Sequence, residues 1–188
     1  MHGRIVECVI PNKESRSYRC PLGVVAVISL WNFSFHLTQR SIAPTLALGN
    51  AVVVEPTSDT PVTGGVLIAK VFEEAGLPPD ELNVIVGAGS QIGDEFVSHP
   101  IPSLISFTGS SIARILLAKR AAVNTSKTLF SSSVVPTHLV LTDADLKLAL
   151  HAAVVGKCLQ QGQLCMVVNR INIEESIYDE FPPSSLIV

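Results

Sequence analysis

The sequence is poor in charged and aromatic side chains, and both shortages limit what the protein can do. Only 15% of its 188 residues are charged and only 5% are aromatic, whereas 47% are hydrophobic. The net charge of −3 argues against nucleic-acid binding, which requires a clustered basic face. An apolar content this high is typical of the interior of an α/β enzyme.

The sequence also lacks long apolar runs and paired cysteines. No uninterrupted run approaches the roughly 18–20 residues that a membrane-spanning helix needs, so no membrane segment is expected. The first four residues, Met-His-Gly-Arg, do not resemble a secretory signal, which predicts a cytoplasmic location. The four cysteines form no CxxC pair and have no histidine at zinc-ligand spacing, so we expect no metal site.

Short β-branched runs alternate with helical stretches along most of the chain. Strands are predicted over residues 24–28, 51–54, 82–86, 103–107 and 138–141. The helices include one that ends at Gly49-Asn50 and a last one that is capped by the Asp-Ala-Asp run at 143–145. This alternation predicts βαβ units, and therefore an α/β fold with a parallel sheet flanked by helices.

Three polar segments follow these elements and carry the chemistry. A Trp-Asn-Phe run at 31–33 follows the first strand, and a Phe-Thr-Gly-Ser run at 107–110 leads from the fourth strand into a helix. A Gly-Gln-Leu-Cys run at 162–165 follows the last helix and ends on a thiol. A thiolate can attack an aldehyde carbonyl, an amide can hold the resulting oxyanion, and a helix N-terminus favours an anion.

Together the three segments resemble the NAD(P)-dependent aldehyde dehydrogenases, most closely the members that act on vanillin and benzaldehyde. The resemblance runs from about Pro21 to Phe181. It implies a Rossmann-like cofactor domain over residues 1–131 and the beginning of a catalytic domain over residues 132–188. It further implies a chain truncated at both ends relative to the family, and a homo-oligomer or self-association through exposed apolar surface.

The resemblance implies that the protein oxidises an aromatic aldehyde to a carboxylate with NAD or NADP. Cys165 stands at the family's nucleophile position, and Asn32 at the position of the amide that stabilises the oxyanion. Gly109 and Ser110 stand where the family contacts the pyrophosphate. Gly89 belongs to a second candidate part of the dinucleotide site, whose glycines at 87, 89 and 93 do not have the G-x-G-x-x-G spacing.

Two departures from the family bear on the choice between NAD and NADP. Glu55 replaces a lysine that contacts the adenosine ribose; its carboxylate could accept a ribose hydroxyl but would repel a 2′-phosphate. Ser58 replaces the glutamate of many NAD-preferring relatives and removes one repulsive group. The two replacements act in opposite directions, so the sequence leaves both dinucleotides open. Arg114, where the family has glycine, either blocks the cofactor groove or offers a phosphate contact.

The largest departure concerns the general base that hydrolyses the thioester. The family reads L-E-L-G-G where this chain has the run LFSSSVVP at 129–136, and either Ser131 or Phe130 stands at the place of the glutamate. Positioned bases contribute about 10²–10⁴ in rate, so hydrolysis should be slow. Two alternatives therefore remain: a catalytically impaired remnant that keeps a dinucleotide-binding core, and a relative that passes the acyl group to CoA.

Overall fold

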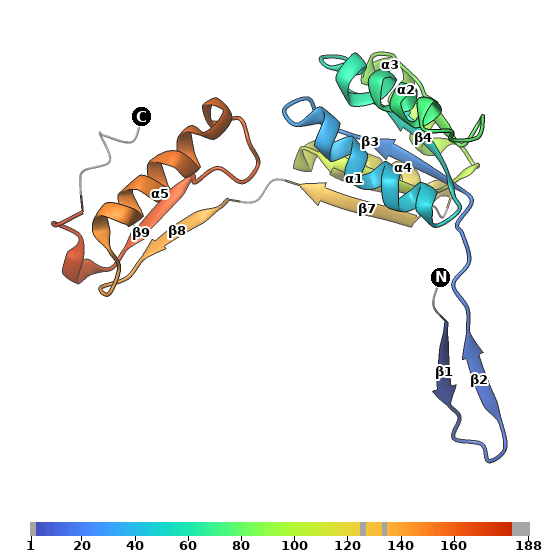
Figure 1. Ribbon diagram of the computed structural model, residues 1–188, viewed down its shortest axis with the longest axis horizontal. Helices are drawn as coiled ribbons and strands as arrows, with labels where there is room; N and C mark the ends of the chain where they lie inside the picture. Colours follow the sequence, from blue (N-terminus) through green and yellow to red (C-terminus); the bar gives the residue numbers. More distant parts are fainter. Residues whose placement is uncertain (1–2, 125–126, 133–134, 182–188) are drawn as a thin grey trace. The chain divides into compact units, whose positions relative to one another are not determined.

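The computed structural model describes residues 3–124, 127–132 and 135–181, shown in Figure 1. The chain forms two compact units, residues 1–131 and residues 132–188. The assignment of these units as a cofactor domain and the start of a catalytic domain stays a prediction. No helix in the described ranges combines the length and the apolar character that crossing a membrane requires.

The first unit is built on a five-stranded sheet in the order β5-β4-β3-β6-β7. β3 pairs in parallel with both β4 and β6, and β4 pairs in parallel with β5. The central strand is thus the first of the sheet in sequence, which is the doubly wound arrangement that the sequence predicts. The strands are β3 (Val24–Ile28), β4 (Ala51–Glu55), β5 (Leu82–Val84), β6 (Pro102–Gly109) and β7 (Lys127–Ser132).

Apolar residues on both faces of the sheet explain why helices cover both sides. Val25 and Val27 of β3 pack with Ile42 of α1 and Ile68 of α2, whereas Ala26 packs on the opposite face with Phe96 of α3. Successive strand residues point to opposite faces, so a continuous apolar run needs cover on each. The helices of this unit are α1 (Ser34–Ala47), α2 (Leu67–Glu74), α3 (Gly89–Ser98) and α4 (Ser111–Ala121), with the short turns η1 (Val62–Val66) and η2 (Ala122–Asn124).

Asn50 ties the end of α1 to the start of the central strand. Gly49 has φ +78°, the left-handed conformation expected at a helix C-terminus. The buried Asn50 side chain accepts hydrogen bonds from the backbone N–H groups of Leu22 (2.5 Å) and Gly23 (3.2 Å). The predicted helix end at Gly49-Asn50 is confirmed, and β3 and β4 start in register because of it.

The turn η1 is a π-helix whose two glycines allow it to approach the sheet closely. A Cβ atom added at Gly65 would lie 2.8 Å from both Pro56 Cγ and Val84 Cγ1. Pro56 follows β4 directly and is buried. The close approach therefore fixes the backbone where β4 ends.

Three strands, β1, β2 and β7, do not appear among the sequence predictions. β1 (Arg4–Glu7) and β2 (Glu14–Ser17) form an antiparallel hairpin in which every residue is exposed. The polar composition of this hairpin gives no strand pattern. β7 is likewise polar, with the sequence KTLFSS, and takes its place beside β6 at the edge of the sheet.

The second unit is a small α/β layer in which α5 lies along a two-stranded parallel sheet (Figure 1). The predicted strand at 138–141 is found as β8, one residue earlier, but it pairs with β9 instead of joining the main sheet. Asp145 caps α5 as predicted, because its Oδ1 accepts a 3.0 Å hydrogen bond from the Leu148 N–H. The elements are β8 (Thr137–Val140), α5 (Leu146–Cys158), η3 (Leu159–Gly162), β9 (Arg170–Ile173) and η4 (Glu175–Ile177).

Candidate functional site

The carboxyl ends of three neighbouring strands meet at one edge of the main sheet. Ile28, the last residue of β3, is in register with Glu55 of β4 and with Phe107 of β6. The chain runs from β3 to the strands on either side of it, so this edge is a topological switch point. In doubly wound sheets, ligands bind in the crevice at such a point. The loops that follow these three strands therefore form the candidate site.

Asn32 lies in the loop between β3 and α1, as the sequence predicts. The residue is half-buried and sits immediately before Phe33, the N-cap residue of α1. A buried 2.6 Å hydrogen bond between Ser29 Oγ and Thr38 Oγ1 ties the start of this loop to the helix. The anchoring restricts the position of the Asn32 amide relative to the sheet edge.

Ser34, which stands where the family usually has proline, has a structural use here. Its Oγ lies 3.1 Å from Thr63 Oγ1, and the pair forms a hydrogen bond between α1 and η1. A Cβ atom on Gly64 would lie 3.1 Å from Ser34 Cβ, so the two segments are in close contact. A proline at this first helical position would set φ but could not make the bond.

Glu55 is a buried carboxylate at the end of β4. Only 5% of the residue is exposed, and its Oε2 atom has no hydrogen-bond partner. Burial raises the pKa of the Glu55 carboxyl above its ordinary value. An unpartnered charge in this position is costly, so the side chain is a strong candidate for a ligand contact.

The first turn of α3 lies against this carboxylate. A Cβ atom on Gly89 would be 3.4 Å from Glu55 Oε1, and one on Gly93 would be 3.7 Å from the same oxygen. Ala88, the N-cap residue of α3, provides no side-chain acceptor for the first-turn N–H groups. The sequence predicts Gly89 as a cofactor contact, and the structure brings it beside Glu55.

Gly109 and Ser110 form the junction between β6 and α4. Gly109 is buried, and a Cβ atom there would overlap the ring of Phe107. Ser110 is the N-cap residue of α4, and its Oγ accepts a 3.3 Å hydrogen bond from the Ala113 N–H. The predicted placement at the beginning of a helix is confirmed, and helix N-termini favour anions such as phosphate.

The remaining predicted residues of the first unit lie in less enclosed surroundings. Ser58 is exposed in the turn after β4. Arg114 is half-buried in the first turn of α4, and its backbone N–H bonds to the Ser110 carbonyl.

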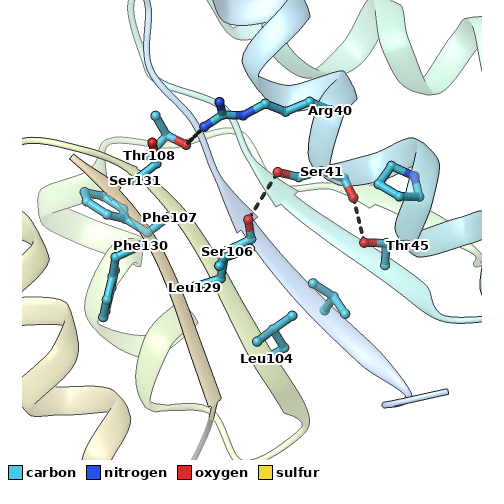
Figure 2. A pocket seen from close by; sticks show the side chains of 12 residues that line it. Arg40, Ser41, Thr45, Leu104, Ser106, Phe107, Thr108, Leu129, Phe130 and Ser131 are labelled. Atoms are coloured by element: carbon cyan, nitrogen blue, oxygen red, sulfur yellow. Dashed lines mark hydrogen bonds between the residues drawn. The ribbon is translucent and has the colours of Figure 1, made fainter. Parts of the chain in front are cut away.

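A pocket of about 390 Å³ opens between α1 and the strands β6 and β7. The sequence does not predict this pocket. Arg40 Nη2 donates a 3.0 Å hydrogen bond to Thr108 Oγ1 across it, and Ser41 bonds to Ser106 at 3.1 Å (Figure 2). The rings of Phe107 and Phe130 meet edge to face, with centroids 6.1 Å apart. The pocket is lined by Val25, Arg40, Ser41, Pro44, Thr45, Leu104, Ser106, Phe107, Thr108, Leu129, Phe130 and Ser131.

This pocket contains both residues that stand at the place of the family's glutamate. Ser131 and Phe130 line it, and its twelve lining residues include no aspartate or glutamate. The signal that could have revealed the pocket is the pair Ser41 and Thr45, which lie one turn apart on α1. Thr45 Oγ1 donates a 2.6 Å bond to the Ser41 carbonyl, also drawn in Figure 2.

Cys165 belongs to the second unit, where it is exposed in a turn between η3 and β9. The segment before it is unusual, because Gln160, Gln161 and Gly162 all have positive φ, at 51°, 59° and 73°. Such backbone strain in residues other than glycine is concentrated at functional sites. The convergence of the Cys165 thiol with the Asn32 amide stays a prediction.

No group of three or more potential metal ligands is found within the ranges that the structure covers.

Comparison with known proteins identifies relatives of this chain. The chain is 50% identical over 184 residues to a vanillin dehydrogenase of Corynebacterium glutamicum, and 46% identical over 181 residues to a benzaldehyde dehydrogenase of Bacillus subtilis. These matches cover 96% of this chain but only 38% and 37% of the relatives. The crystal structure of a NAD-dependent benzaldehyde dehydrogenase from Corynebacterium glutamicum matches 96% of this chain and 40% of its own, with TM-score 0.88 and 48% identity.

The family model described as the aldehyde dehydrogenase family matches residues 1–185, nearly the full length of the sequence. The shares of the relatives that are covered show that the chain spans a little over a third of their length. The agreement of the sequence match with the fold of the first unit leaves one conclusion. This chain belongs to the aldehyde dehydrogenase family.

Proposed function

We propose that the chain carries out the oxidation of an aromatic aldehyde through a cysteine thioester on Cys165. The observation that supports the proposal is the carboxyl end of three adjacent strands of the main sheet. Glu55 and Gly109 are the last residues of β4 and β6, and Asn32 lies in the loop after β3. The names of the relatives, vanillin dehydrogenase and benzaldehyde dehydrogenase, support an aromatic aldehyde as the substrate class.

The residues of the first unit fit a nicotinamide dinucleotide. The unpartnered Oε2 of Glu55 could accept a hydroxyl, and the missing side chain at Gly89 leaves room beside it. The N-terminus of α4 at Ser110 offers backbone N–H groups and a favourable dipole to a phosphate. When bound, the dinucleotide would supply the hydride acceptor of the reaction.

Within this proposal, the protein's own groups act on the aldehyde carbonyl. The Cys165 thiolate attacks the carbonyl carbon and forms a carbon–sulfur bond, which places negative charge on the carbonyl oxygen. The Asn32 amide donates a hydrogen bond to that oxygen, a contact of the kind that contributes about 10²–10³ in rate in a serine protease. Loss of hydride from the carbon then leaves an acyl thioester on Cys165.

The fate of this thioester distinguishes two functions. Hydrolysis needs a base that removes a proton from water, and the lining of the pocket at Ser131 includes no carboxylate. This observation favours transfer of the acyl group to a thiol such as CoA, which needs less activation than water. A chain that binds the dinucleotide but forms no thioester would be the impaired remnant.

The experiment that tests these functions mixes the 188-residue protein with NAD or NADP and benzaldehyde and follows NADH or NADPH formation. We expect one equivalent of reduced dinucleotide per chain and then a slow phase, with turnover accelerated when CoA is added. Rapid multiple turnover in the absence of CoA would instead indicate that a base elsewhere in the protein activates water. Absence of any burst, together with measurable dinucleotide binding by calorimetry, would identify the remnant.

Cys165→Ser should abolish the burst completely, because a hydroxyl at its ordinary pKa is a poor nucleophile. Cys20→Ser is the matched control, since Cys20 is also exposed but lies in the other unit. Mass spectrometry of the quenched reaction should find the acyl group on the peptide containing residue 165. An acyl adduct elsewhere, or a burst that survives Cys165→Ser, would contradict the role of Cys165.

A further inference from the structure

The guanidinium of Arg40 gives the pocket between α1 and the strands β6 and β7 a positive charge. Its Nη2 atom donates a 3.0 Å hydrogen bond to Thr108 Oγ1, which is a neutral acceptor. Within the residues that the structure describes, Arg40 belongs to no ion pair, and the lining of the pocket includes no aspartate or glutamate. A guanidinium carries several N–H donors in a planar fork that matches a carboxylate. The charge of the pocket therefore favours a ligand with a carboxylate group.

The floor of the pocket is the face of β6 that α1 covers. Leu104, Ser106 and Thr108 alternate along β6, so their side chains lie on the same face of the sheet. The hydroxyl of Ser106 is hydrogen-bonded to that of Ser41 on α1, in the middle of this floor. Figure 2 shows Arg40 and Thr108 at one end of the pocket and Leu104 at the other. Because a strand rises by about 3.3 Å per residue, the distance along β6 from Thr108 to Leu104 is about 13 Å.

The end of the pocket away from Arg40 is mainly apolar. Val25 belongs to the apolar core beneath α1, and Leu104 packs against this core. Thr45 also lines this region, but its hydroxyl donates a 2.6 Å hydrogen bond to a carbonyl of its own helix. Leu129 of β7 is 62% exposed. A hydrocarbon chain placed here would remove apolar surface from water, which is favourable.

We propose that this pocket binds an aliphatic carboxylate of medium chain length, with its carboxylate on Arg40 and its hydrocarbon chain along Leu104 and Leu129. The inference goes beyond the proposed function, because the ligand is neither an aldehyde nor a dinucleotide. A volume of about 390 Å³ is sufficient for one such molecule. An aromatic carboxylate fits less well, because the side chain of Phe107 alternates with that of Ser106 and points to the opposite face, where its ring meets that of Phe130.

Calorimetric titration of the 188-residue protein with butanoate, hexanoate and octanoate, each below its micelle concentration, tests the proposal. Each added pair of buried methylene groups should tighten binding by about tenfold. Octanol has the same chain length without the charge. It should bind about tenfold more weakly than octanoate, because it lacks the charged partner of Arg40.

Two pairs of variants test the two ends of the pocket. Arg40→Gln should weaken octanoate binding by about tenfold, to the level of octanol. Arg19→Gln removes the same charge from an exposed position outside the pocket and should leave the affinity unchanged. Leu129→Ala should weaken octanoate several-fold and leave butanoate unchanged, whereas Leu139→Ala, at an equally exposed leucine of the second unit, should change neither. Circular dichroism checks that each variant is folded.

Several results would overturn the proposal. Octanoate binding that survives Arg40→Gln would assign the affinity to apolar surface elsewhere, and tighter binding of benzoate than of octanoate would exclude the aliphatic class. Absence of octanoate binding would overturn the proposal as well. If the protein then sediments as a dimer that Leu129→Ala dissociates, the pocket is covered by a second copy of the chain. Dinucleotide binding and thioester formation are measured separately, so the proposed function is unaffected by these outcomes.

Discussion

The burial of Glu55 makes the stability of the first unit depend on pH. Burial raises the pKa of this carboxyl above the ordinary value, so folding favours its protonated form. The stabilisation that protonation provides is complete below the ordinary carboxyl pKa, and it is lost as the pH rises through the raised value in the folded state. At pH values above the raised pKa, the ionised Glu55 therefore weakens the fold.

Glu55→Gln should consequently stabilise the protein by about 1 kcal/mol at pH values above the raised pKa, since it removes an unpartnered buried charge there. The gain should shrink as the pH falls and vanish below the ordinary carboxyl pKa, where the wild-type side chain is neutral. Urea denaturation of both proteins across this pH range measures the difference. A gain that is independent of pH, or one that grows in acid, would mean that Glu55 is not buried as described.

The contrast between Glu55 and Ser34 shows how far residue-level prediction reaches. The sequence identifies Glu55 as a departure from the family, because the residue type alone reveals that. It cannot show that Ser34 bonds to Thr63, or that Glu55 lacks a partner. Both facts depend on η1 and α3, segments distant in sequence that pack against them.

At the scale of the elements, α5 depends on a single side-chain cap. Asp145 Oδ1 accepts the only side-chain hydrogen bond described at the N-terminus of this helix, from the Leu148 N–H. Asp145→Ala should destabilise the second unit by about 0.5–2 kcal/mol, the usual cost of losing an N-cap. Helical circular dichroism followed through thermal unfolding measures the effect.

Asp143→Ala provides the matched control for this helix. Asp143 is exposed and lies two residues before Asp145, and its replacement by alanine removes an equal charge. A loss of stability equal to that of Asp145→Ala would indicate that the effect arises from net charge and not from the cap.

The elements that the sequence predicts best are those buried on both faces. The strand predicted at 24–28 has the same bounds in the structure, and the one at 51–54 extends by a single residue, because β-branched runs leave little ambiguity. The predicted strand at 82–86 is shorter, and the one at 103–107 is longer. β7 has neither pattern, since its position is fixed by its neighbour β6 and not by its own apolar residues.

The candidate site shows the same division. Gly109 and Ser110 could be placed from sequence, because a strand followed by a serine-capped helix is a local signal. The pocket that holds Arg40 and Thr108 could not, because the two residues are separated by 68 positions and meet only where α1 packs on the sheet beside β6. Local chemistry is readable from sequence, whereas the choice of partners requires the fold.

At the scale of the whole molecule, many large apolar side chains reach the surface. On α4, Ile112, Ile115 and Leu116 are 76%, 52% and 51% exposed, and their spacing places them on one side of the helix. On the opposite face of the sheet, Val66, Leu67 and Val71 of the segment η1–α2 are 47%, 44% and 51% exposed. Contiguous exposed apolar patches mark interaction surfaces or promote aggregation.

We therefore expect the protein to self-associate in a concentration-dependent way. Sedimentation velocity should show species larger than a monomer, and the double variant Ile112→Ser with Leu116→Ser should shift the distribution towards the monomer. Lys119→Ser alters an exposed polar residue of the same helix and should have no such effect. A wild-type protein that sediments as a monomer at all concentrations would contradict this expectation.

Because β3 pairs with strands on both sides, it sets the register of β4 and β6 at the candidate site. Its last residue, Ile28, is aligned with Glu55 on one side and with Phe107 on the other. Deleting one residue inside β3 would rotate its remaining side chains to the opposite face and shorten the reach of the Asn32 loop towards both neighbours at once. Insertions in the loops around this end of the sheet leave the register of the strands unchanged, whereas a change in the length of β3 alters its alignment with both β4 and β6.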